Sequence, residues 1–264
     1  MLLTVFLAGA LYLLATLHIA FQIRAGHADR RNVFLLAGFA AVVLHGVHSA
    51  NTIYVDGAVN LGFLSAASLL GMIIALVAII ISLVRPVAIL SVTAYPIAFT
   101  ALLLYALLGS NHEPRTFSAG VGVHIVLSML AYAVITMATA HAVLLAAKNR
   151  LFRQHRIEGL MRVLPPIQTM EAILFELVAT GFVLLTAAIV AGLLYVDDFF
   201  AQHLIHKTAL TLGSWVTLGV LLIGHRISGW RGDTAIRWMI STFVLLAIAF
   251  FGSKFVLEII LGRQ

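Results

Sequence analysis

The sequence has no cysteine and few charged residues. Only 10% of its 264 residues are Asp, Glu, Lys or Arg, whereas a soluble domain carries about 25%. The absence of cysteine excludes disulfides, thiolate metal sites, iron–sulfur clusters and covalent c-type haem attachment. Any bound metal or haem must therefore be held by His, Met, Tyr or carboxylate groups.

Several patterns that carry chemistry are missing as well. The chain has no Ser-His-Asp order, no glycine-rich loop that would cradle a phosphate, and no zinc-protease helix motif. The formal net charge is +6, but the basic residues lie in short loops between apolar runs, so the charge does not indicate nucleic acid. We expect neither an enzyme nor a nucleic-acid-binding protein.

The apolar residues gather in runs of helix length. Hydrophobic residues make up 62% of the chain and the mean hydropathy is +1.09. A helix needs roughly 20 apolar residues to cross a bilayer, and runs of about this length occur at 2–22, 33–53, 60–84, 87–109, 121–147, 171–195, 204–225 and 236–260. Such runs exclude an outer-membrane barrel, whose strands are short and alternating. The sequence therefore predicts an all-α polytopic membrane bundle with about eight transmembrane helices, forming a single integral membrane domain over residues 1–264.

The distribution of Lys and Arg predicts the orientation of these spans. Twelve of the sixteen basic residues lie in the loops that follow odd-numbered spans, on one side of the membrane. By the positive-inside rule this side is cytoplasmic, which places both termini outside. The longest of these loops, 148–170, alternates basic and apolar residues, and we expect a cytoplasmic amphipathic linker along the anionic inner leaflet. A solvated basic loop that only sets the topology is the alternative.

The eleven histidines fall into two layers at the predicted depths. Towards the outer ends of spans lie His45, His48, His124, His203 and His206; towards the inner ends lie His18, His141 and His225; and in loops lie His27, His112 and His155. Histidines inside a bilayer are costly and mark functional positions, and imidazoles at one depth on different helices suit a bis-histidine haem site or a metal site. Each also has a structural interpretation, a hydrogen bond to a neighbouring helix, which we favour for His27, His112, His155 and His203. Glu176 has two open roles: to orient an inner imidazole, or to extend to the membrane surface.

Four stretches resemble a known family. "HIVLSMLAYAV" (124–134) resembles the His-x-x-x-x-Met-x-x-Tyr-Ala segment of the CcsA-type cytochrome c assembly proteins, which are haem-handling membrane proteins. "HKTALTLGSW…GHRISGWRG" (206–232) and "FFGSKF" (250–255) resemble the C-terminal third of that family, and "VNLGFLSAASLLGM" (59–72) resembles an earlier span. The resemblance covers roughly residues 55–260, and it is greatest to the short, eight-span YpjD-like (CorE-like) inner-membrane branch.

The resemblance implies a haem-binding role in the bacterial cytoplasmic (inner) membrane. Family members hold haem at the outer face with paired histidines and a Trp-rich loop, for delivery to apocytochrome c. His124 matches the first external histidine, and Tyr132 and Trp215 match motif positions, so we include both with the candidate haem-contacting residues. The chain departs from the family in two places: "VDDFFAQHLIHK" (196–207) has no Trp, and "VLEIILGRQ" (256–264) has no histidine. His225 lies two residues beyond the position of the buried inner histidine.

These departures lead to a hypothesis for this chain. His206 replaces the missing external histidine as the partner of His124, so that the two are metal ligands of a non-covalent haem b. Lys207 and Arg115 are then donors to the haem propionates, although Lys207 also suits an extension to the outer headgroups. The expected partners are haem, the lipid bilayer and other cytochrome c maturation proteins.

Three other functions remain open. A b-type electron-transfer protein would use His45 or His48 with His124 or His206 outside, and His18, His141 or His225 inside. A divalent-cation transporter or accessory protein would use the intramembrane histidines and Glu176. A structural membrane protein would use its histidines only in interhelical hydrogen bonds.

Overall fold

The computed structural model describes residues 2–25, 31–55, 57–85, 88–109, 114–154, 164–196 and 205–252. Eight of its helices are long and apolar enough to cross a membrane. The predicted all-α polytopic membrane fold is therefore confirmed. The predictions for His27, His112, His155 and His203 concern positions outside the described residues.

The chain divides into two compact units. Unit 1 comprises Met1–Arg115 and Ala147–Met170, and unit 2 comprises Thr116–Ala146 and Glu171–Gln264. Apolar side chains that cover the outside of the helices, such as Phe21 and Leu36, are each 70% exposed. A surface of this kind suits lipid rather than water.

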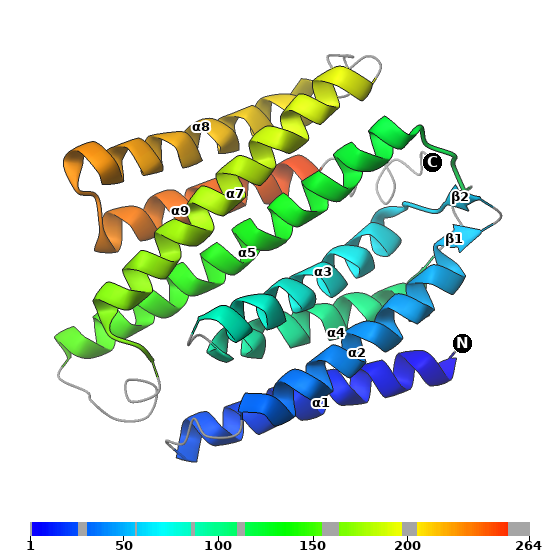
Figure 1. Ribbon diagram of the computed structural model, residues 1–264, viewed down its shortest axis with the longest axis horizontal. Coiled ribbons are helices and arrows are strands. Elements are labelled where there is room, and N and C mark those ends of the chain that lie inside the picture. Colours follow the sequence, from blue (N-terminus) through cyan, green and yellow to red (C-terminus); the bar gives the residue numbers. More distant parts are fainter. Residues whose placement is uncertain are drawn as a thin grey trace. The chain divides into compact units, whose positions relative to one another are not determined.

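Unit 1 contains four long helices and a small hairpin (Figure 1). Its elements are α1 (Leu2–Ala25), α2 (Arg31–Thr52), β1 (Tyr54–Val55), β2 (Ala58–Val59), α3 (Phe63–Val84), the 3₁₀ turn η1 (Ala88–Leu90) and α4 (Ser91–Leu108). Helix α1 packs against α2 and α4, and α3 packs against α2 and α4. Gly57, at φ +82°, turns the hairpin, in which Tyr54 pairs with Val59. Val59 also exchanges two backbone hydrogen bonds with Arg115, of 2.9 and 3.1 Å.

Close helix packing in unit 1 depends on glycine at one point above all. A Cβ atom at Gly38 on α2 would lie 2.1 Å from the hydroxyl oxygen of Tyr95 on α4. Tyr95 is fully buried, and its hydroxyl donates to the carbonyl of Phe34 at 3.4 Å. The missing side chain of Gly38 therefore makes room for an aromatic ring between two spans.

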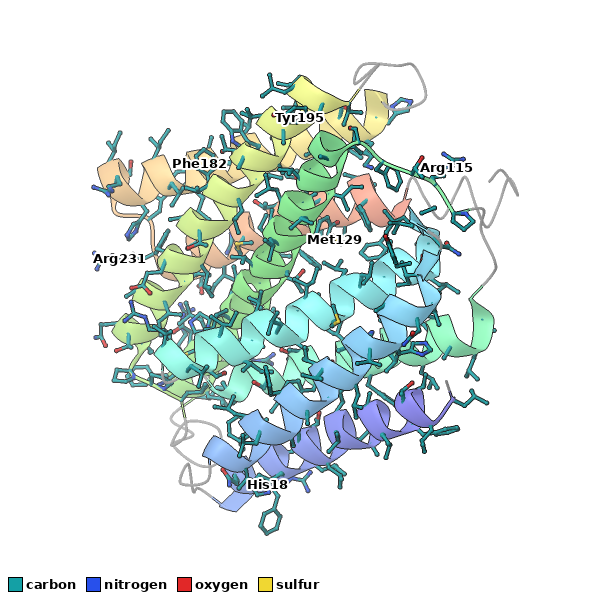
Figure 2. All side chains as sticks on the ribbon, turned by 45° about the vertical axis from the view of Figure 1, so that its right-hand side comes forward. His18, Arg115, Met129, Phe182, Tyr195 and Arg231 are labelled. Atoms are coloured by element: carbon teal, nitrogen blue, oxygen red, sulfur yellow. The ribbon has the colours of Figure 1, made fainter. Side chains whose placement is uncertain are left out.

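Unit 2 is built from four further helices. The end of α5 and the beginning of α7 belong to unit 1. Its elements are α5 (Ala119–Arg153), α7 (Ile167–Tyr195), α8 (Ile205–Ser228), α9 (Gly232–Ala247) and the π turn η2 (Ile248–Gly252). Helix α8 packs against α9 and η2. Gly229 and Gly232, at φ +65° and +54°, form the short connection between α8 and α9. Arg231 lies in this connection (Figure 2).

The helix boundaries differ from the predicted spans at the link between α5 and α7. Helix α5 continues to Arg153, past the apolar run that ends near 147, because helical hydrogen bonding does not require apolar side chains. Lys148 is buried, and its ammonium donates to the carbonyls of Leu164, at 3.0 Å, and Pro165. Helix α7 begins directly after Pro165 and Pro166, since proline is compatible with the first turn of a helix.

Candidate functional site

His124 has the hydrogen bond that is typical of a metal-ligating histidine. It lies near the start of α5 and is half-buried. Its Nδ1 is 2.8 Å from the carbonyl oxygen of Ala188 on α7. Because a carbonyl only accepts, Nδ1 must carry the hydrogen, and the neutral ring keeps a lone pair on Nε2. Such a bond fixes the tautomer and the ring orientation in histidine ligands.

Lys207 is the candidate cation in the same unit as this histidine. It belongs to the first turn of α8 and is half-buried. Its ammonium interacts electrostatically with the His124 ring and lies 5.7 Å from the centroid of the Phe250 ring. The ammonium therefore lies over an aromatic ring of the π turn η2.

Three aromatic rings of α5 and η2 pack against one another in unit 2. Tyr132 on α5 packs against Phe250 and Phe251, with ring centroids 5.4 and 6.1 Å apart. Its hydroxyl donates to the carbonyl of Leu246, just before the π turn. Turns of this kind are frequent at functional sites. We call His124, Tyr132, Lys207, Phe250 and Phe251 the His124 cluster.

The other residues predicted for this site lie differently. His206 precedes Lys207 on α8 and is exposed, as expected for neighbours about 100° apart around a helix. Trp215 lies about two turns further along and donates from Nε1 to the hydroxyl of Thr186 at 2.8 Å. Its indole also stacks on Phe182 of α7 (Figure 2) at 5.4 Å. Arg115 is exposed and belongs to unit 1.

His225, at the opposite end of α8, shows the same pattern as His124. Its Nδ1 is 2.9 Å from the carbonyl of Trp230, so Nδ1 donates and Nε2 keeps the lone pair. The ring is stacked on Phe175, with centroids 3.5 Å apart. Glu171 stabilises the connection between α8 and α9 by accepting a hydrogen bond from the backbone N–H of Gly232 at 2.9 Å.

Unit 1 holds two buried histidines with contrasting surroundings. His45 is fully buried, and its Nδ1 and Nε2 lie 3.4 Å from the Tyr12 hydroxyl and 2.9 Å from the Ser68 hydroxyl. His48, one turn further along α2, is 6% exposed. Neither of its ring nitrogens has a hydrogen-bond partner among the described residues, and its ring packs edge-on against Tyr105.

Sequence reasoning missed several of these partners. Phe250, Tyr12 and Ser68 were not predicted, although a tyrosine in the middle of an apolar span is itself a signal. Glu176, for which two roles were open, is exposed. Glu171, and not Glu176, accepts the hydrogen bond from the backbone of Gly232 at the start of α9. In the part of the chain that the structure describes, no group of three or more His, Asp or Glu is placed to hold a metal ion.

Fold and site together define a polytopic helical membrane protein with preoriented histidines. The sequence profile of the Cytochrome C assembly protein family matches residues 32–261, and the chain belongs to this family. It is 28% identical over 233 residues to "Inner membrane protein YpjD" of Escherichia coli (strain K12), covering 87% of this chain and 88% of that protein. It is also 32% identical over 144 residues to a 28.8 kDa protein from the nifR3-like 5' region of Azospirillum brasilense, over 54% of this chain and 53% of that protein. No solved structure matches the chain.

Proposed function

We propose that this protein binds haem b non-covalently at the His124 cluster, as a cytochrome c assembly protein of the bacterial inner membrane. The observation that carries the proposal is the hydrogen bond from His124 Nδ1 to the Ala188 carbonyl, which leaves Nε2 available to iron. Membership of the family and the relative named as an inner membrane protein support the role and the location. The absence of cysteine restricts attachment to non-covalent ligation.

The residues of the cluster suit this ligand in chemistry. Bound haem supplies an iron centre that can change oxidation state. His124 offers an imidazole nitrogen of fixed tautomer, and the rings of Tyr132, Phe250 and Phe251 offer apolar and aromatic surface. His206, which is exposed in the first turn of α8, is the second axial ligand in this proposal.

The test is a spectrum of the protein purified from haem-replete cells. A reduced b-type absorption spectrum and a pyridine-haemochrome assay near one haem per chain are expected. His124→Ala is expected to lose most of the haem. His206→Ala is expected to keep haem but to change from low-spin to high-spin, because one axial ligand is removed. His18→Ala is the matched control, since the hydrogen bond described for His18 on α1 (Figure 2) is to Gln22 of its own helix, at 2.9 Å.

Two outcomes would count against the proposal. Purified protein without a Soret band would overturn haem binding altogether. A His206→Ala protein with full haem content and an unchanged spectrum would overturn the His124–His206 pair while leaving haem binding in place. Delivery of the haem to other cytochrome c maturation proteins is the extension of this proposal, and it depends on the first result.

His225 favours a second candidate, a b-type electron-transfer protein with haem at both ends of unit 2. The specific observation is that its Nδ1 is also bonded to a backbone carbonyl, which leaves Nε2 available. Two haems per chain with separate midpoint potentials, one of them lost in His225→Ala, are expected on this alternative. A single haem that is unaffected by His225→Ala would exclude it.

A further inference from the structure

Lys207 is the one charged side chain of the His124 cluster. Its ammonium lies 5.7 Å from the centroid of the Phe250 ring and interacts electrostatically with the His124 ring. Neither ring carries a negative charge. The apolar rings of Tyr132 and Phe251 lie against Phe250 on the same side of unit 2. Among the described residues, Lys207 is therefore a half-buried cation placed beside neutral groups.

Such a placement is unfavourable for the protein alone. Taking an ammonium out of water has a desolvation penalty, which a neutral imidazole and one aromatic ring do not fully offset. A lysine with a purely structural role finds oxygen acceptors instead. Lys148 does so in unit 1, where its ammonium donates to the carbonyls of Leu164 and Pro165. Buried Lys148 and half-buried Lys207 thus differ in the groups that are described around their charges.

We infer that Lys207 is the specificity-determining residue of the site and that it binds a carboxylate of the ligand, namely a propionate of the haem whose iron His124 ligates. This rests on the proposed function and adds to it the orientation of the ligand, with its anionic edge towards the first turn of α8. A charge-assisted bond from ammonium to propionate supplies an oxygen acceptor, which none of the described residues provides.

The first test uses the haem-free full-length protein in detergent. Lys207→Met keeps the length of the side chain and removes its charge, so it is expected to raise the midpoint of thermal unfolding. Lys148→Met is the matched control and is expected to lower that midpoint, because it leaves two carbonyls without their donor. A fall in the midpoint of Lys207→Met like that of Lys148→Met would show a structural lysine and overturn the inference.

The second test compares haem with its dimethyl ester, in which both propionates are uncharged. Lys207→Met is expected to weaken the binding of haem by about tenfold or more, and to leave the binding of the ester unchanged. Lys207→Arg is expected to restore most of the affinity for haem, because a guanidinium also binds carboxylates. Equal affinities of wild type and Lys207→Met for haem would overturn the inference.

The outcomes separate this inference from the function on which it rests. Wild-type protein that binds neither haem nor the ester contradicts the proposed function and the inference together. Wild-type protein that binds both compounds equally well, in a manner that depends on His124 but not on Lys207, contradicts the inference alone. A selective loss of haem binding in Lys207→Met, with Lys148→Met still binding haem like wild type, supports both.

Discussion

Opposite changes in stability are expected when the two buried histidines of α2 are replaced by leucine. His45→Leu leaves the hydroxyls of Tyr12 and Ser68 without the ring nitrogens at 3.4 and 2.9 Å. Loss of these bonds in a buried setting is expected to lower the free energy of unfolding by about 1–3 kcal/mol. His48 is 6% exposed, and neither of its nitrogens has a partner among the described residues. His48→Leu is therefore expected to raise the free energy of unfolding by about 1–3 kcal/mol.

The assay is reversible unfolding of ligand-free protein in detergent micelles, followed by circular dichroism at helix wavelengths. His18→Leu serves as the control for removing a histidine, because its bond to Gln22 lies within one helix, and a change near zero is expected. A loss of stability in His48→Leu equal to that in His45→Leu would refute the reasoning, since it would mean that both rings are bonded in the folded protein.

Two further predictions concern helix packing. Gly38→Ala is expected to destabilise unit 1 by about 1–3 kcal/mol through overpacking, because its new Cβ would meet the buried Tyr95. The control is Gly213→Ala, where nothing lies within 4 Å of the new Cβ, and this change is expected to be neutral or stabilising by about 1 kcal/mol. Equal stabilities of the two variants in thermal unfolding would contradict the prediction. Thr186→Val removes the acceptor at 2.8 Å from Trp215 Nε1, and it is expected to lower the free energy of unfolding by about 1 kcal/mol. A red shift or loss of intensity in the tryptophan fluorescence is expected as well. An unchanged emission spectrum and an unchanged stability would argue against this bond.

Much of the candidate site was within reach of the sequence. His124, Tyr132 and Lys207 were named from motif positions, and in the structure Tyr132 and Lys207 both lie next to the ring of Phe250. The sequence did not show how Lys207 and its neighbour His206 are directed relative to His124. Successive residues point about 100° apart on a helix, so the rotation of α8 about its axis decides the direction of each. That rotation is set by packing, which a single sequence does not encode in any local pattern.

The sequence by itself determined the class of the protein. Eight apolar runs of spanning length fix eight membrane helices, because in a bilayer the backbone must satisfy its own hydrogen bonds and the length of a span follows from the thickness of the membrane. These requirements are local, so they can be read from hydropathy alone. Only the tertiary structure decided that His45 is satisfied by Tyr12 and Ser68, and that Lys207 lies over Phe250. Each of these contacts joins side chains from different helices, and their formation depends on the shapes of entire helix faces packed against one another.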